Sequence, residues 1–359
     1  MAASITNCFL EWGLDTIFSI TVDNASSNNV TVIEMSKQLN NWGANIMEGQ
    51  HLHVRCMTHI LNLIVQDGLK KIDKSVKRVR QSMKYVKQSA ARVKKFKECC
   101  EYQMITCNKS LCLDVPTRWN STYLMLEIAQ HFELAFERFC FYDNGFLDYL
   151  RTSPCEDGTN AGAFTSEDWE NVRAMIKFLK TFYDLTLKVS GSEYVTNSVH
   201  LVKIAELDLI LKEMIENEDF HLRKIATNMR EKFRKYWGDP KKMNKMIFIS
   251  SVLDPRNKLE YVPFEIVDMF GKKIGNNGYG NFQRRDLMRT KQQFEKHKEI
   301  SGGSSSKSEL GKYLAEEIEP DSKNFDILGW WKINEPRFPI LAEMARDVLA
   351  ILISSVASE

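Results

Sequence analysis

Hydrophobic and polar positions near the start of the chain form short apolar runs separated by helix-like spacings. The first run, 17–22, is rich in β-branched residues and ends at a carboxylate, Asp23, so it predicts a strand followed by a turn. Helical spacing of apolar residues begins near Thr31. A second short strand is expected over 51–56, and an apolar helix over 58–69. This order of strands and helices predicts an α/β region with a partly parallel sheet.

The stretch 70–97 predicts one long helix with a strongly basic surface. Twelve of its residues are Lys or Arg, and Asp73 is its only carboxylate. This charge suits the phosphate backbone of DNA, but a solvated helix face has the same composition. Both interpretations stay open. Under the first, the candidate DNA contacts are Lys84, Lys87, Lys94 and Lys95.

A second candidate nucleic-acid contact follows Pro116. Trp119 lies there between Arg118 and Asn120, and it does not fall on a periodic core position. An arginine beside an aromatic ring can stack on a base and hold its phosphate. A tryptophan at the start of a helix also commonly packs into a core, so the alternative is ordinary packing ahead of an apolar helix over 124–139.

The second half of the chain is predicted to be mostly helical. Apolar positions from 166 to 237 recur at the spacing of an all-α core, and no chemistry is assigned to them. Gly and Ser occupy every position of 301–308 except Lys307, which predicts a flexible linker. After the linker, Trp330, Trp331 and Phe338 form a heavy aromatic cluster. Such a cluster needs a partner surface, either in its own chain or in a second copy.

Composition narrows the class of protein. Of the 359 residues, 43% are hydrophobic and 27% are charged, which is typical of a soluble globular protein. The net charge of +2 does not by itself indicate nucleic-acid binding. The eight cysteines show no evenly spaced framework, so reduced thiols in the cytosol or nucleus are expected. No apolar run reaches the roughly 18 residues of a membrane span, so no membrane partner is expected.

Five motifs follow one another along nearly the whole chain. They are Thr21-Val-Asp-Asn-Ala-Ser26, Arg55-Cys-Met-Thr-His-Ile-Leu-Asn-Leu-Ile-Val-Gln-Asp67, Pro116-Thr-Arg-Trp-Asn-Ser-Thr122, Leu253-Asp-Pro-Arg256 and Leu328-Gly-Trp-Trp-Lys-Ile-Asn-Glu-Pro-Arg-Phe-Pro-Ile-Leu341. In this order the chain resembles the hAT (hobo/Activator/Tam) transposases and their domesticated plant relatives of the sleeper type. Each motif is weak alone, and the order of all five is specific.

The resemblance implies an α/β plus α fold. It is a partial RNase H-like fold that is interrupted by a large all-helical insertion and followed by a C-terminal dimerisation segment. The predicted limits are 1–125 for the partial RNase H-like region, 126–300 for the helical insertion, 301–311 for the linker and 312–359 for the dimerisation region.

The resemblance also implies a site. In the family, two Asp and one Glu hold divalent Mg or Mn for the cleavage and transfer of DNA strands. Asp23 matches the second Asp, and Glu359 matches the Glu. Two further motifs match residues near the cleaved DNA end and near the active site: Arg118 with Trp119, and Cys56 with His59.

Departures from the family pattern weaken the catalytic expectation. No strand precedes residue 17 to carry the first catalytic Asp, no amino-terminal zinc finger is found, and the helix expected after Glu359 is missing. Asp23 and Glu359 are therefore expected to be vestigial, with weak metal ligation at Asp23. No enzymatic activity and no cofactor are expected in this chain.

The resulting hypothesis is a nuclear, hAT-derived protein that dimerises and contacts DNA. Its partner would be a second copy or a related hAT protein. The predicted dimer contacts are Trp330, Trp331, Phe338 and Leu341. Two alternatives remain, a fragment of an active DNA transposase and a helical protein-interaction module without a DNA role.

Overall fold

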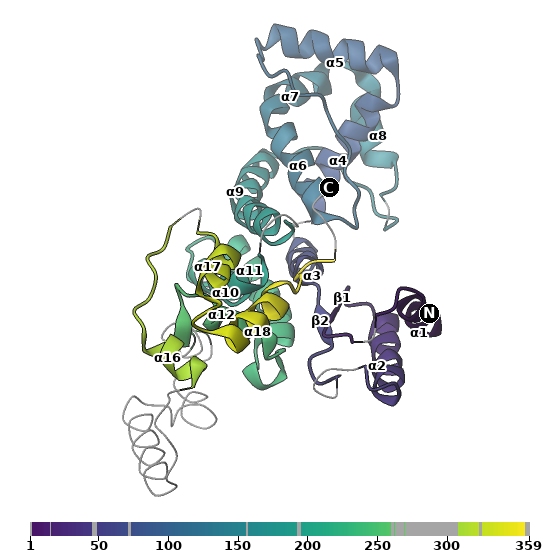
Figure 1. Ribbon diagram of the computed structural model, residues 1–359. Helices are drawn as coiled ribbons and strands as arrows, with labels where there is room; N and C mark the ends of the chain where they lie inside the picture. Colours follow the sequence, from purple (N-terminus) through teal and green to yellow (C-terminus); the bar gives the residue numbers. More distant parts are fainter. Residues whose placement is uncertain are drawn as a thin grey trace, which may run out of the picture. The chain divides into compact units, whose positions relative to one another are not determined.

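The chain folds into two compact units. The computed structural model describes residues 2–14, 16–44, 49–70, 73–155, 157–191, 195–259, 262, 269, 308–322 and 325–355, and its ribbon is drawn in Figure 1. Unit 1 comprises Met1–Ile60, Lys188–Glu213 and Phe233–Glu359, and unit 2 comprises Leu61–Leu187 and Met214–Lys232. The predicted domain limits divide the chain differently from these two units. The predicted boundary at residue 125 falls inside a helix of unit 2. The domain limits stay a prediction.

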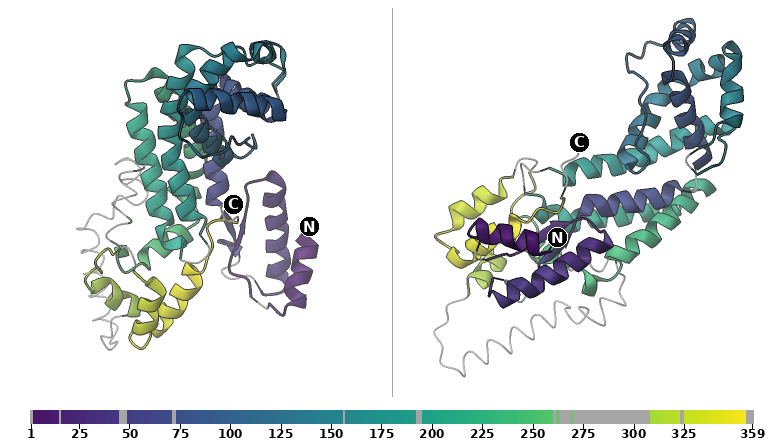
Figure 2. Two further views of the ribbon diagram at one scale, coloured as in Figure 1. Left: turned by 90° about the horizontal axis from the view of Figure 1, so that it is seen from above. Right: turned by 90° about the vertical axis from the view of Figure 1, so that its right-hand side faces the viewer.

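The first part of unit 1 is a small α/β layer. Its elements are α1 (Ala2–Glu11), β1 (Ile20–Val22), α2 (Ser26–Asn41), β2 (His53–Arg55) and the start of α3 (Met57–Leu69). The two strands pair in parallel, with Ile20 opposite His53, as the strand–helix–strand pattern predicts. Apolar side chains of α2 and of the loops pack beneath β1, and α1 and α2 lie side by side in Figures 1 and 2.

The rest of unit 1 is helical. It contains α12 (Met246–Val252), α16 (Glu309–Ala315), α17 (Ile327–Asn334) and α18 (Pro339–Leu349), and α10 (His200–Ile215) and α11 (Phe220–Trp237) carry residues of both units. The helices α16–α18, yellow-green to yellow in Figures 1 and 2, lie together around one apolar core. Ser308 caps α16, which starts inside the predicted linker 301–311. Residues 301–307 of that linker lie outside the described residues.

In the described residues of unit 2, the regular secondary structure is helical apart from an isolated antiparallel bridge between Pro154 and Asn160. It holds α4 (Asp73–Lys87), α5 (Ala90–Tyr102), α6 (Trp119–Ala129), α7 (Glu133–Tyr142), α8 (Asn144–Thr152) and most of α9 (Ser166–Val189). The expected single helix over 70–97 is wrong. Ser89 has an extended backbone (φ −146°, ψ 132°), so α4 ends before it and α5 starts after it.

An aromatic core fixes the second of these helices. The ring of Phe96 on α5 lies 4.7 Å from that of Phe136 and 5.5 Å from that of Phe139, both on α7. The helix predicted over 124–139 also breaks, because a short 3-10 turn at Gln130–Phe132 separates α6 from α7. The break lets α7 pack its aromatic face against α5.

Candidate functional site

Asp23 lies where β1 ends, as the sequence predicts. Its Oδ1 accepts hydrogen bonds from the backbone N–H of Ala25 (2.8 Å) and from Nδ2 of Asn28 (2.6 Å). The Ala25 bond is the main cause that lowers the pKa of this carboxyl below its usual value, and His59 lowers it further through its charge. Asp23 is therefore ionised at neutral pH, and it also holds the turn that leads into α2.

Cys56 and His59 come to the same edge of the sheet as Asp23. The backbone N–H of Cys56 donates to the carbonyl of Val22 (2.9 Å), so the carboxyl ends of both parallel strands meet there. Burial alone would raise the pKa of the Cys56 thiol, but hydrogen bonds from Ser355 and Thr58 outweigh it and lower the pKa. The Cys-x2-His motif thus lies at the same sheet edge as Asp23, and its role near an active site stays a prediction.

The segment 351–355 was not predicted at this edge. Thr21 Oγ1 donates to the carbonyl of Leu352 (2.6 Å), and the N–H of Met57 donates to the carbonyl of Ile353 (2.8 Å). The hydroxyls of Thr58 and Ser354 lie 2.8 Å apart. These contacts bring the last described residues to the carboxyl end of β1. The expected carboxylate Glu359 lies outside the described residues.

The donors at this edge do not by themselves make a metal site. A Mg²⁺ site needs several oxygen ligands around one ion. Among the residues that the structure describes, no group of three or more His, Cys, Asp or Glu side chains could hold a metal ion. Asp23 and His59 are two groups, and we assign no metal-dependent step to them.

The four candidate lysines of α4 and α5 are exposed but differ in their contacts. Lys95 forms an ion pair with Asp143 (3.0 Å), and Lys87 donates to the carbonyl of Leu111 (3.1 Å). Asp143 also accepts from Tyr85, whose pKa rises to about 12, chiefly through burial and then through this bond. Lys87 and Lys95 therefore hold parts of unit 2 together, which leaves Lys84 and Lys94 as the stronger candidates for an external phosphate.

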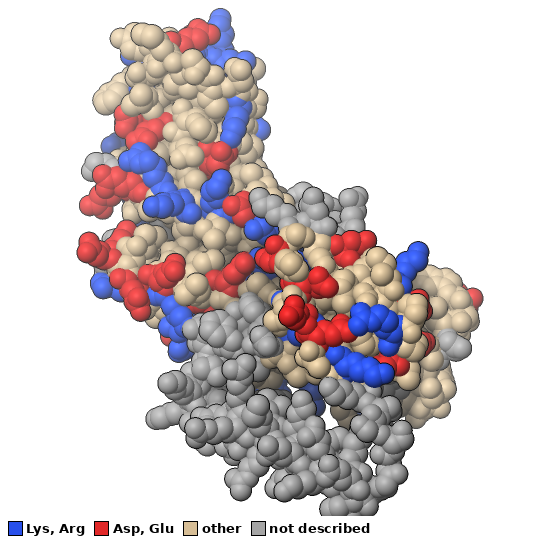
Figure 3. Space-filling view, turned by 60° about the vertical axis from the view of Figure 1, so that its left-hand side comes forward, with Lys and Arg blue, Asp and Glu red and all other residues tan. Residues whose placement is uncertain are grey.

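Other basic residues of α4 pair with carboxylates inside unit 2. Arg78 lies 2.7 Å from Asp168, and Arg80 lies 2.6 Å from Asp114. On the face of the molecule in Figure 3, Lys and Arg are interspersed with Asp and Glu. The ion pairs of Arg78 and Arg80 neutralise part of the positive charge of the basic run.

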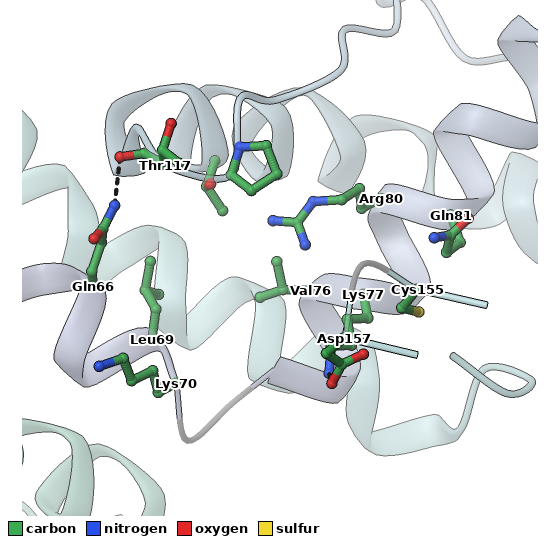
Figure 4. Close-up of a pocket in the computed structure, with 12 residues that line it drawn as sticks. Gln66, Leu69, Lys70, Val76, Lys77, Arg80, Gln81, Thr117, Cys155 and Asp157 are labelled. Atoms are coloured by element: carbon green, nitrogen blue, oxygen red, sulfur yellow. Dashed lines mark hydrogen bonds and ion pairs between the residues drawn. The ribbon is translucent and has the colours of Figure 1, made fainter. Parts of the chain in front are cut away.

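Arg118 and Trp119 differ in their exposure to solvent. Arg118 is exposed, whereas Trp119 is 2% exposed and is the first residue of α6. Packing, the alternative left open by the sequence, describes Trp119 here, because a buried ring cannot stack on a base. The preceding Thr117 accepts a hydrogen bond from Gln66 at the rim of a cavity of about 360 Å³ (Figure 4).

The side chains around this cavity are already paired in part. Lys77 lies 2.6 Å from Asp157, and both side chains line the cavity in Figure 4. Lys77 is the main cause that lowers the pKa of Asp157. Arg80, paired with Asp114, lines it too. Charge neutralisation of this kind makes the cavity a weaker phosphate site than its lysines suggest.

The aromatic cluster finds its partner surface within unit 1. Trp331 is 0% exposed, and its Nε1 donates to the carbonyl of Leu253 (2.9 Å), while the hydroxyl of Tyr313 donates to the carbonyl of Val252 (2.9 Å). Phe338 and Leu341 are buried in the same core. Of the four predicted dimer contacts, Trp330 alone is partly exposed. Trp331, Phe338 and Leu341 therefore belong to a core of their own chain, which is one of the two partner surfaces that the sequence left open.

The Leu253-Asp-Pro-Arg motif anchors this C-terminal segment. Arg256 pairs with the buried Asp254 (2.7 Å). Lys258 donates to the carbonyls of Tyr313, Glu316 and Glu317 at distances of 2.9, 3.0 and 2.9 Å, at the end of α16. A lysine that binds the last carbonyls of a helix satisfies acceptors that the helix leaves open.

Sequence reasoning missed the apolar side chains on the outer faces of α17 and α18. Ile333 is 79% exposed and Ile340 is 75% exposed. Ile333 lies two residues after the buried Trp331, and Ile340 lies directly before the buried Leu341. A helical projection around these buried residues is the signal that would have found them. Exposed apolar side chains on neighbouring helices are typical of a protein–protein interface.

Comparison with protein-family models places the chain among transposases. Residues 54–178 match the ZBED1 RNase-like helical domain. Residues 198–288 match the hAT-like transposase, RNase-H fold, and residues 309–359 match the hAT family C-terminal dimerisation region. The chain therefore belongs to the hAT transposase family.

Its relatives include plant zinc finger BED domain-containing proteins of the sleeper type and proteins named as putative AC transposases of Zea mays. The chain is 32% identical over 400 residues to zinc finger BED domain-containing protein RICESLEEPER 2 of Oryza sativa subsp. japonica, a match that covers all of this chain and 53% of the relative. It is also 32% identical over 380 residues to DAYSLEEPER of Arabidopsis thaliana, covering 99% of this chain and 52% of the relative. The chain spans about half the length of the curated relatives it matches.

In the described part of the chain, no helix is both long and apolar enough to span a bilayer.

Proposed function

We propose that this chain is a hAT transposase-derived nuclear protein that self-associates and contacts DNA, without transposase activity of its own. The observation that carries the proposal is the match of residues 309–359 to the family's dimerisation region. Unit 1 holds this region firmly through the contacts of Trp331 and Lys258. A rigid scaffold of this kind can present a surface to a partner.

The partner surface that we propose lies on the outer faces of α17 and α18. The two helices pack against each other. Their exposed apolar side chains are Leu328, Ile333, Ile340 and Met344. The partner is a second copy of this chain or a related hAT protein with the same region. Light scattering of the purified chain and of surface variants tests this part of the proposal.

The DNA contact that we propose uses Lys84, Lys94 and Arg118. We expect the Lys84→Glu, Lys94→Glu double variant to bind duplex DNA at least about tenfold more weakly than the unmodified chain. Each lost phosphate contact also lowers the slope of log affinity against log salt by about 0.9. Fluorescence anisotropy of a labelled duplex at several salt concentrations measures both quantities.

The matched control for this experiment is Lys177→Glu with Lys180→Glu, which makes the same charge change at exposed positions of α9 in unit 2. It should retain affinity. If the α4–α5 variant binds as tightly as its control, the contact lies elsewhere. If the unmodified chain shows no salt-dependent affinity at all, the alternative of an interaction module without a DNA role replaces the proposal.

Strand cleavage is the second candidate function. The convergence of Asp23, His59 and the segment 351–355 at one sheet edge favours it. We expect no nicking of supercoiled plasmid by this chain in Mg²⁺ or Mn²⁺ buffer, and no difference between it and Asp23→Asn. Nicking that disappears in Asp23→Asn would establish catalysis and contradict the inactive assignment.

A further inference from the structure

A cavity of about 410 Å³ in unit 1 is lined mainly by basic and polar side chains. Its walls come from three stretches that are far apart in the sequence, at 50–60, at 200 and at 236–247. None of its lining residues is Asp or Glu. Its basic lining residues are Arg55, Lys241, Lys242 and Lys245. Lys242 also lies 3.8 Å from Asp239, which does not line the cavity. The remaining excess of positive charge selects against cations and for anions.

His200 is a buried polar side chain with no partner in this cavity wall. It is 2% exposed, and within the described part of the chain neither ring nitrogen has a hydrogen-bond partner. Burial lowers its pKa to about 3, so the ring is neutral and carries one N–H donor. A buried donor without an acceptor costs folding free energy. A ligand oxygen in the cavity would remove that cost.

His53, in the 50–60 stretch of the cavity lining, also has a buried ring nitrogen, Nε2, without a hydrogen-bond partner among the described residues. Burial, followed by the charge of Arg55, lowers its pKa, so this ring is neutral too. Two neutral imidazoles with unused nitrogens therefore line a cavity that is otherwise rimmed by cations.

Asn244 holds these walls in place. Its Nδ2 donates to the carbonyls of His51 (3.2 Å) and His53 (3.0 Å), and its Oδ1 accepts from the N–H of Met246 (2.9 Å). The loop that carries Lys241, Lys242 and Lys245 is thus tied to β2. A preorganised site loses less entropy when a ligand binds.

The lining of the cavity favours an oxyanion as its ligand. The described residues contain no group of three ligating side chains for a metal, and the lysines would repel one. Tetrahedral oxyanions accept several N–H donors at once from imidazole and ammonium groups. We propose that this cavity is a binding site for a phosphate group, supplied by a nucleic-acid strand or by a small phosphate compound. The site goes beyond the proposed function, because Lys84, Lys94 and Arg118 belong to unit 2 and self-association plays no part in it.

The test uses the full chain and inorganic phosphate as the probe. Histidine Cε1–H signals are followed by NMR during a phosphate titration, with chloride at the same ionic strength as the reference. We expect saturable shifts of the His200 and His53 signals. The absence of saturable shifts with phosphate would overturn the proposal.

Two variants and one control connect the signal to the cavity. The first variant is a triple variant that combines Lys241→Gln, Lys242→Gln and Lys245→Gln. It should weaken phosphate binding by about tenfold or more, since each substitution removes one positive charge. Lys37→Gln, an exposed site on α2, should leave it unchanged. His200→Leu should remove binding without lowering the urea midpoint, because it replaces an unpartnered polar group. Unchanged phosphate affinity in His200→Leu or in the triple variant would contradict the proposal.

A final arm separates the two sources of phosphate. A short single-stranded oligonucleotide that displaces inorganic phosphate and shifts the same histidine signals supports a nucleic-acid strand as the ligand. An oligonucleotide that leaves those signals unchanged, while inorganic phosphate shifts them, supports a small phosphate compound. These readouts do not depend on oligomeric state, so failure here and failure of self-association are distinguishable.

Discussion

The Trp331→Ala variant is expected to lose about 3–5 kcal/mol of folding free energy in unit 1. The ring is fully buried between Tyr313 and Trp330, at centroid distances of 5.1 and 5.0 Å, and its Nε1 bonds to Leu253. Alanine would leave a large cavity and an acceptor without its donor. Urea unfolding followed by circular dichroism measures the loss.

Lys332→Ala is the matched control, because it is the next residue of α17 and is exposed. Surface substitutions of this kind usually change stability by less than about 0.5 kcal/mol. An equal midpoint for Trp331→Ala and Lys332→Ala would mean that the aromatic cluster is not a core. The cluster would then again be available as a contact for a partner.

The Ile333→Glu, Ile340→Glu double variant is expected to be monomeric. Both side chains are more than 70% exposed, so glutamate costs little in the monomer. In an interface, each carboxylate would be buried without a counter-charge, which is strongly unfavourable. Size-exclusion chromatography with light scattering reads the change directly.

The control for the double variant is Val30→Glu, at an exposed apolar position of α2 in unit 1. It should keep the mass of the unmodified chain. A double variant that stays associated would move the interface away from α17 and α18. Point variants are preferable to deletion of 309–359, because Tyr313, Trp331 and Phe338 fill the core of unit 1.

The local pattern of hydrophobic and polar residues was sufficient to predict the two parallel strands at the start of the chain. The run that ends at Asp23 contains β1, and the parallel partner of β1 is the second predicted strand. Both features depend on residues within about 40 positions, where periodicity and turn residues carry the information. The hAT family membership is likewise confirmed, because the order of motifs is a property of sequence.

Features that depend on distant residues were not predictable in the same way. The basic stretch splits at Ser89 because α5 packs its Phe96 against α7, and hydropathy alone does not report that contact. Trp331 is buried in a core that includes Val54 and Leu253, which are far from it in sequence. The phosphate-site residues His53, His200 and Lys241 come from three separate stretches, and no spacing rule unites them.

The molar mass of the unmodified chain in solution tests the central claim most directly. Light scattering at micromolar concentration should give twice the 41.6 kDa of one chain, and the mass should fall toward one chain on dilution if exchange is fast. A mass of 41.6 kDa at every concentration, with no association at high protein concentration, would contradict self-association through the C-terminal region.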